Sequence, residues 1–500
     1  MLENLALGFS IVFVPANLGY AFLGAFLGTL IGVLPGIGPL AAISMLLPVT
    51  FTLDPTSGLI MLAGIYYGAQ YGGSTTAILI NMPGENSSVV TCLDGHAMAR
   101  QGRAGPALAI AALASFMAGT IATCVIAFGA PLLAELALDF GAPEYFALMV
   151  LGLIAAVSLS SSSFIKAIAM VVLGLFLGLV GTDINSGTVR FTFGVSELFE
   201  GIEFVSLAIG LFALTEIAFN LEKTQDRTLL TTKIKNLFPS FRDIRTAFLP
   251  ALRGTGIGSV LGLLPGGGAL ISSFAAYAIE KKVSGRHGEP FGTGRIEGVA
   301  APEAANNAGA QTSFIPMLTL GLPSNALMAL MLGGLLVHGI TPGPDLIRTK
   351  PDIFWGVVAS MWIGNFMLVI LNLPMVGLWV RLLRVPYGVL FPAIVLLACI
   401  GVYCTNLKPL DVMLAAGFGM TGFVLRKLGC DITAVALAFV LGPLLEQYFR
   451  RSLLLSRGDP MIFLNKPIAA ALLTLAVILI LFQAFSFVRK ARTKYFAEDE

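Results

Sequence analysis

Charged residues are scarce in this chain. Asp, Glu, Lys and Arg together make up 12% of its 500 residues, whereas an ordinary soluble domain contains about 25%. This shortage excludes a conventional soluble globular protein. Apolar residues make up 56% of the sequence and its mean hydropathy is +0.88, values that are typical of a protein that crosses a membrane several times.

Cysteine and histidine are also rare. The chain has five cysteines and three histidines, and they form neither a C-x-x-C nor an H-E-x-x-H pattern. Metal and redox sites often show such spacings, so we expect packing roles for the cysteines and no cofactor other than a coupling ion. The N-terminus lacks a basic segment followed by an A-x-A site, and we therefore expect no cleaved signal peptide.

The positive charges are clustered rather than spread along the chain. Lys and Arg gather within 222–253, within 281–297 and in the tail 489–494. Cytoplasmic loops of membrane proteins carry an excess of these residues, so we expect these three segments in the cytoplasm. Since solvated loops explain the clusters, we expect no nucleic-acid partner.

Long apolar runs dominate the rest of the sequence. A membrane-spanning helix needs roughly 20 mostly apolar residues. Runs of this kind occupy 107–129, 143–158, 163–181, 200–220, 353–380, 386–404, 408–425, 430–448 and 467–488. Because these runs are continuous rather than alternating, they predict an all-α polytopic membrane protein and not a β-barrel.

The sequence contains an internal repeat. "GTLIGVLPGIGPL" at 28–40 returns as "GSVLGLLPGGGAL" at 258–270, 230 positions later. Each copy ends a ladder of glycines spaced by four residues: Gly24, Gly28, Gly32 and Gly36 in the first, and Gly254, Gly258, Gly262 and Gly266 in the second. This spacing puts the glycines on one helix face, where another backbone can approach closely. Two aligned ladders that lead into Leu-Pro-Gly indicate a duplication.

The repeat divides the chain into four regions. We expect a first transmembrane repeat at 1–221, a basic cytoplasmic linker at 222–245, a second transmembrane repeat at 246–450, and an extra helix with a basic tail at 451–500. If linker and tail are both cytoplasmic and the last helix crosses once, the second repeat crosses an odd number of times. An odd number inverts its topology relative to the first repeat, although three arginines near 450 would then lie outside.

Helix breakers occur as matched pairs in the two repeats. Pro35, Gly36 and Gly38 correspond to Pro265, Gly266, Gly267 and Gly268, and the pair Pro83–Gly84 corresponds to Pro323–Ser324. Irregular backbone within a membrane is tolerated where protein buries it or where it lines a cavity. In inverted-repeat transporters, broken helices meet near the midplane and their ends face an anion or a cation. We therefore expect broken helices and re-entrant hairpins that meet at a binding site.

Uncharged polar residues gather beside the second pair of breaks. They lie within 70–88 and within 306–325, with Glu85 at the first hairpin tip and Glu303 beside the second cluster. Hydroxyls and amides can bind a carboxylate without a permanent charge to desolvate. Helix capping and contacts between helices explain many such residues in membrane proteins, but two clusters beside matched breaks predict a binding site.

These stretches together resemble one known family. "GVLPGIGP", "YYGAQYGGSTTAILINMPGE", "LDGHAMARQGRAGPAL", "LLPGGGALISSFAAYAIEKK" and "GVAAPEAANNAGAQTSFIPMLTLGLPSNALMALMLGG" are similar to the large membrane subunit of the tripartite tricarboxylate transporters, the TctA-type protein. The resemblance implies a secondary transporter of the bacterial inner membrane. It further implies a small TctB-type membrane subunit, a periplasmic TctC-type binding protein, and uptake of citrate or a related carboxylate driven by Na⁺ or H⁺. A broader resemblance to ion-coupled carboxylate transporters implies an elevator-type mechanism, and a dimer is compatible with it.

The resemblance, mapped onto the matched breaks and polar clusters, gives a set of candidate site residues. The candidates for substrate binding are Ser74, Thr75, Thr76, Asn81, Pro83, Gly84, Asn306, Asn307, Pro323, Ser324 and Asn325. The candidates for ion binding or helix breaking are Pro35, Gly36, Gly38, Pro265, Gly266, Gly267, Gly268 and Glu303. Two alternatives stay open: a passive organic-anion channel, which could share the broken helices, and an intramembrane enzyme, for which no complete protease motif is found in the sequence.

Overall fold

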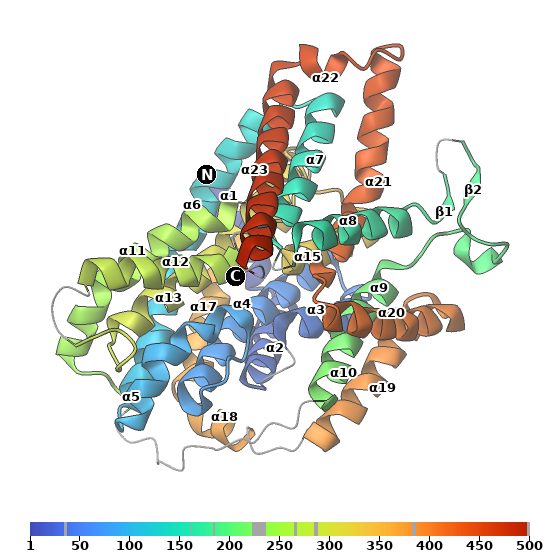
Figure 1. Cartoon of the computed structure of the whole chain (residues 1–500). Helices are drawn as coiled ribbons and strands as arrows, with labels where there is room; N and C mark the ends of the chain where they lie inside the picture. The colour runs from blue at the N-terminus through green and yellow to red at the C-terminus, as the bar shows by residue number, and fades with distance from the viewer. Residues whose placement is uncertain are drawn as a thin grey trace.

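The computed structural model describes residues 1–34, 38–160, 162–183, 186–222, 237–264, 268–284, 289–382 and 387–497, and helices make up most of it (Figure 1). Strands β1 (Gly181–Thr182) and β2 (Val189–Arg190) pair antiparallel in a small hairpin that projects from the helices. The all-α prediction is therefore confirmed, apart from this two-residue ladder.

The first half of the chain contains the helices up to residue 222. They are α1 (Leu2–Val12), α2 (Pro15–Val33), α3 (Gly38–Thr50), α4 (Pro55–Ile80), η1 (Asn86–Val89), η2 (Cys92–His96), α5 (Ala97–Arg100), α6 (Ala104–Ala137), α7 (Ala142–Leu159), α8 (Phe164–Gly178), η3 (Ser196–Leu198), α9 (Phe204–Ala208), η4 (Ile209–Leu214) and α10 (Thr215–Glu222). Here η1 and η3 are 3₁₀ turns, and η2 and η4 are π-helical.

The second half begins at residue 241. Its helices are α11 (Phe241–Leu263), α12 (Gly268–Ser284), α13 (Glu297–Thr312), α14 (Phe314–Leu320), α15 (Ala326–Val337), α16 (Leu346–Thr349), α17 (Pro351–Asn372), α18 (Val376–Leu382), α19 (Tyr387–Asn406), α20 (Pro409–Lys427), α21 (Ile432–Leu455), α22 (Ile462–Asn465) and α23 (Pro467–Ala497). Most of the expected linker, 223–236, lies outside the described residues. The start of α11 falls inside the range 222–245 that the linker was expected to occupy.

Every predicted apolar run contains a helix. Within the described residues, six helices are long and apolar enough to cross a membrane: α2, α6, the continuous stretch Phe204–Glu222, α17, α21 and the Pro467–Phe485 part of α23. The chain is thus a multi-pass membrane protein. The run 353–380 contains two helices rather than one, because α17 ends at Asn372, two residues before Pro374, which cannot continue the backbone hydrogen bonding.

The first glycine ladder lets α2 lie directly on the backbone of α4. A Cβ atom added at Gly24, Gly28 or Gly32 would lie within 2.4 Å of a carbonyl oxygen of α4, on Met61, Ile65 and Ala69 respectively. Any side chain at these positions would therefore force the two helices apart. The close approach predicted from the glycine spacing is confirmed.

The second ladder makes the same contact in the second half. A Cβ added at Gly254, Gly258 or Gly262 would lie within 2.4 Å of a carbonyl oxygen of α13, on Ala301, Ala305 and Gly309 respectively. Since these partners are each 240 residues after their counterparts in α4, the halves contain equivalent helix pairs. Helices α4 and α13 are buried almost throughout, and they form the centre of the molecule.

The loops after these central helices are also equivalent. Asn81 ends α4 with φ 58°, and Gly321 ends α14 with φ 67°, so both residues are left-handed. Four residues later, the side chains of Glu85 and Asn325 cap the following helix by accepting hydrogen bonds from the backbone N–H of Ser87 (3.1 Å) and of Met328 (3.0 Å). We call the segments 81–88 and 321–325 the first and second tips.

This packing predicts opposite effects for two neighbouring glycines of α11. Gly258→Ala should lower the free energy of unfolding by about 1–3 kcal/mol, because its methyl group would overlap the carbonyl oxygen of Ala305. Gly256→Ala is the matched control: nothing lies within 4 Å of its Cβ, and alanine favours a helix by up to about 1 kcal/mol over glycine. Thermal unfolding of the purified variants in detergent measures both. Equal loss of stability in the two variants would contradict the packing.

Candidate functional site

Glu303 of α13 lies at the centre of a buried polar network. Its side chain is fully inaccessible to solvent. The hydroxyl of Ser74, on α4, donates a hydrogen bond of 2.5 Å to Oε2 of Glu303, and the hydroxyl of Thr91 donates to Oε1. The two central helices are therefore joined through one carboxylate, with both donors supplied by the first half of the chain.

A second buried carboxylate, that of Glu85, lies in the first tip. The amide of Asn306 donates a hydrogen bond of 3.3 Å to it. The hydroxyl of Ser87 also contacts it and lies 2.7 Å from the side-chain oxygen of Asn306. Ser273 of α12 donates to the backbone carbonyl of Ser87 (2.9 Å). The first tip is thus held by side chains from the second half.

No basic side chain within the described ranges forms an ion pair with either carboxylate. Burying an unpaired negative charge is costly, and hydrogen bonds from neutral hydroxyls and amides offset that cost only in part. The arrangement therefore favours neutralisation of Glu85 and Glu303, which a bound proton or a bound cation can supply.

A small cavity of about 10 Å³ lies beside this network. Polar side chains on its wall belong to Tyr71, Ser74, Thr75, Ser115 and Asn372. The hydroxyl of Tyr71 and the side-chain oxygen of Asn372 have no hydrogen-bond partner among the described residues. A volume of this size holds roughly one water molecule, so the cavity as it stands has no room for a carboxylate such as citrate.

The second tip has an unpaired polar group of its own. The hydroxyl of Ser324 is buried and has no hydrogen-bond partner among the described residues. Its neighbour Asn325 is partly exposed, and the amide of Asn325 donates to the hydroxyl of Ser313 (3.3 Å). Gly268, at the start of α12, has φ +46°, and a Cβ added there would lie 3.1 Å from Nδ2 of Asn325. The helix break and the second tip are therefore adjacent.

The structure brings together some of the predicted site residues and separates others. Ser74, Asn306 and Glu303 belong to the central network, and Asn307 joins it by donating to Ser115 (2.7 Å). Thr75 lines the cavity instead.

Other candidates support the helix ends. Thr76 donates to the carbonyl of Val33 (2.9 Å) at the end of α2, and a Cβ added at Gly84 would lie 1.9 Å from the carbonyl oxygen of Gly32. Asn81 and Pro83 are exposed, Pro323 is buried, and Gly38 begins α3 with φ +66°. The predictions for Pro35, Gly36, Pro265, Gly266 and Gly267 lie outside the described residues.

Several residues of the network were not predicted as site residues. Glu85 and Ser87 were recognised only as members of a polar cluster. Thr91, Ser115 and Asn372 contact the site from outside the two polar clusters at 70–88 and 306–325. The spacing of polar residues along one helix cannot reveal them, because each of them reaches the site from a different element.

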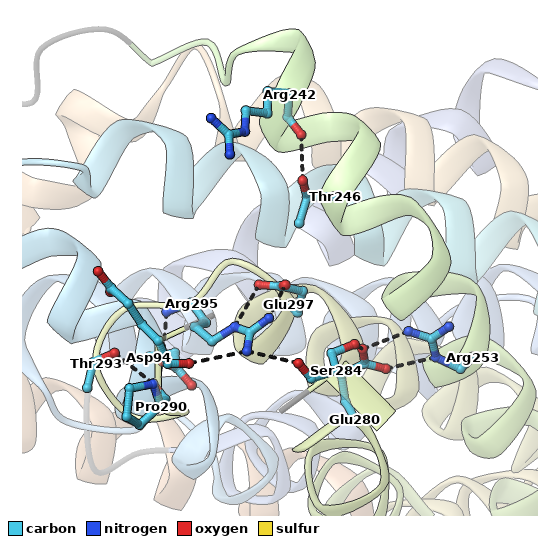
Figure 2. A network of polar contacts seen from close by, with 11 residues as sticks. Asp94, Arg242, Thr246, Arg253, Glu280, Ser284, Pro290, Thr293, Arg295 and Glu297 are labelled. Atoms are coloured by element: carbon cyan, nitrogen blue, oxygen red, sulfur yellow. Dashed lines mark hydrogen bonds and ion pairs between the residues drawn. The ribbon is translucent and has the colours of Figure 1, made fainter. Parts of the chain in front are cut away.

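Asp94 is a further residue whose role the sequence did not predict. Its buried carboxylate accepts backbone N–H bonds of 2.8–2.9 Å from Gly292, Gly294 and Arg295, and a hydrogen bond of 2.9 Å from the hydroxyl of Tyr277. Figure 2 shows Asp94 beside Arg295. These bonds connect η2 of the first half to α12 and to the loop that leads into α13. We call this arrangement the Asp94 clamp.

An ion pair holds the same loop from its other side. The guanidinium of Arg295 donates to Glu297 (2.5 Å) and to the carbonyl of Ser284 (3.0 Å), as Figure 2 shows. The hydrogen bond to Glu297 raises the pKa of Arg295 above its ordinary value. The loop that precedes Glu303 is therefore fixed from both sides.

Comparison with known proteins agrees with these features. The Tripartite tricarboxylate transporter TctA family matches residues 18–437. The chain belongs to this family. It is 55% identical over its full length to an uncharacterized 52.8 kDa protein in the TAR-I ttuC' 3' region of Agrobacterium vitis, and the match covers 99% of that protein. It is also 53% identical, over 243 residues, to the whole of an uncharacterized protein in the TAR-II ttuC' 3' region of the same organism. No solved structure matches the chain.

Membership of the TctA family has two consequences. The family is one of transporters, which agrees with the multi-pass architecture. It also implies a tripartite system, in which a small membrane protein and a periplasmic binding protein accompany the TctA protein. The matched range includes both tips, Glu303 and the Asp94 clamp.

Proposed function

We propose that this chain is the large membrane subunit of a secondary transporter that imports citrate or a related carboxylate across the bacterial inner membrane. A periplasmic TctC-type protein delivers the substrate, and a TctB-type subunit accompanies the chain in the membrane. The observation that carries the proposal is the central network, in which hydroxyls, amides and two buried carboxylates from both halves meet beside the tips.

In this proposal, Glu303 and Glu85 couple uptake to a Na⁺ or H⁺ gradient. Both carboxylates are buried, and no cationic side chain pairs with either one among the described residues. A cation or proton that arrives from solution removes the cost of their buried charge. Its binding therefore stabilises the closed network, and its release favours opening.

The substrate carboxylate binds at the second tip. Ser324 presents a buried hydroxyl without a partner in the described structure, and Asn325 presents an amide. Neutral donors of this kind can bind a carboxylate while the site keeps no permanent positive charge. Asn81 and Gly84 of the first tip are the candidates from the first repeat.

Transport by alternating access accounts for the closed site better than a passive channel does. The cavity beside the network holds about one water molecule, whereas an open anion channel needs a continuous aqueous path. We propose an elevator-type movement in which the helices that carry the tips shift against the rest of the protein. The equivalent helix pairs, α2 with α4 and α11 with α13, support this proposal, because inverted-repeat transporters are built from two such related halves.

The proposed inverted topology predicts that the N-terminus and the basic linker, which the first repeat separates by an odd number of crossings, lie on opposite faces of the membrane. A single cysteine placed at residue 3 and another placed at residue 230, within the linker, each in a background without native cysteines, should react with a membrane-impermeant maleimide from opposite sides. Labelling of intact cells and of inverted vesicles measures this. Reaction of both sites from the same side would contradict inversion.

Glu303→Gln tests the coupling role. Glutamine keeps the size of the side chain, and its amide oxygen can still accept from one of the two hydroxyls of Ser74 and Thr91, while its NH2 group can donate to the other. It binds neither a proton nor a cation as a carboxylate does. We expect gradient-driven uptake to fall roughly tenfold or more, which corresponds to a free-energy difference of about 1.4 kcal/mol. The thermal stability of the protein should be kept or raised, because a buried charge is removed.

Uptake of a labelled carboxylate is measured in proteoliposomes that contain both membrane subunits and the binding protein, with Na⁺ and H⁺ gradients imposed separately. Glu135→Gln, at an exposed position of α6, is the matched control and should behave as the wild type. Unchanged gradient-driven uptake by Glu303→Gln would show that Glu303 does not couple the ion.

Ser324→Ala and Asn325→Ser test the substrate site. Ser324→Ala removes no hydrogen bond that the described structure contains, so the stability of the protein should be unchanged. Uptake should fall roughly fivefold, because the substrate loses one hydrogen bond of about 1 kcal/mol. Serine at 325 can still cap α15 but lacks the amide, and it should also lower uptake. Wild-type uptake by both variants would contradict the assignment of the second tip. A separate measurement, binding of a panel of carboxylates to the periplasmic partner, identifies the substrate.

A further inference from the structure

The first half of α11 has three distinct faces. With 3.6 residues per turn, the residues at 247, 251 and 254 share one face, and all three are buried. A second face is apolar and exposed, with Phe241, Ile244, Phe248 and Leu252. The third face carries the arginines. A helix with an exposed apolar face beside a basic face is typical of a segment that lies in the membrane interface.

The basic face borders a groove of about 450 Å³. Side chains on its wall come from α11, from the end of α12 and from the start of α13: Arg242, Arg245, Thr246, Leu249, Pro250, Arg253, Ser284 and Glu297. Figure 2 shows Arg242 above the level of the ion pairs made by Arg253 and Arg295. The size of the groove is within the range of ordinary ligand sites.

The charges in this groove are not balanced. Arg253 is occupied by a bidentate pair with Glu280 (2.7 and 2.9 Å), and Glu297 is occupied by Arg295. Arg242 and Arg245 are exposed, and no acidic partner is found for either of them in the parts of the chain that the structure describes. Two positive charges are thus left to attract an anion.

Exposed apolar side chains lie directly beside these two arginines. Phe238 is 85% exposed and Phe241 is 82% exposed, although aromatic side chains of this size are normally covered. An anion that is also attached to an apolar chain would satisfy both the arginines and the phenylalanines. Basic pockets of this kind beside transmembrane helices suit lipid headgroups.

We propose that this groove binds the phosphate headgroup of an anionic phospholipid, with Arg242 and Arg245 on the phosphate and the acyl chains along Phe241 and Phe248. The bound lipid fixes the start of α11 at the membrane surface. Since α11 makes the close backbone contact with α13, the lipid stabilises the second half of the protein. The proposal does not depend on the transported substrate.

Native mass spectrometry and thermal unfolding of the full chain in detergent test the proposal. Phosphatidylglycerol should bind more tightly than phosphatidylcholine and raise the unfolding temperature. The variant R242Q/R245Q should weaken phosphatidylglycerol binding roughly fivefold per arginine, the equivalent of about 1 kcal/mol each, and should lose the thermal shift. R242K/R245K keeps both charges and should retain most of the binding, which separates a lost charge from a folding defect.

Arg348→Gln is the matched control, because Arg348 is exposed and in the described structure pairs only with Asp345, the N-cap residue of its own short helix. This variant should bind lipid as the wild type does. Three results would overturn the proposal: unchanged phosphatidylglycerol binding by R242Q/R245Q, equal binding of phosphatidylcholine and phosphatidylglycerol, or an equal thermal shift with inorganic phosphate alone. The last result would assign the groove to a free anion instead of a lipid.

Discussion

The close contact between helix backbones at the two glycine ladders is the constraint on which the rest of the structure depends. Six glycines let α2 and α11 lie against the carbonyl groups of α4 and α13 without intervening side chains. Packing of this kind is how membrane helices associate where no hydrophobic effect drives them together. It places α4 and α13 at the centre, and with them Ser74, Glu303 and Asn306 of the network.

Much of the fold could be predicted from the sequence, because its signals are local. The ladders are visible as a spacing of four residues, and the contacts they make are those that the spacing predicts. Each apolar run contains a helix because a continuous apolar segment in a membrane has few alternatives. The exceptions have local causes too: Pro374 divides one run, and short turns near Gly181 form the small hairpin.

The site could be predicted only in part. Ser74, Asn306 and Glu303 were found because they lie in polar clusters beside helix breakers. Thr91 and Asn372 were not, because their role comes from contacts with residues far away in the sequence, and a single threonine or asparagine in an apolar stretch has no distinguishing local pattern. The duplication did not reveal them either, because the network is not symmetric: the position equivalent to Glu303 in the first repeat is Ala63.

The Asp94 clamp has a mechanical consequence. Four donors from the second half converge on one carboxylate next to the first tip. Hydrogen bonds to a charged group contribute about 1.5–3 kcal/mol each, so a displacement of η2 relative to the loop at 289–296 would have to break several of them at once. The clamp therefore makes one rigid unit of η2, the loop at 289–296 and α13. The hinges of a conformational change then lie outside this unit, at helix ends that the clamp does not hold.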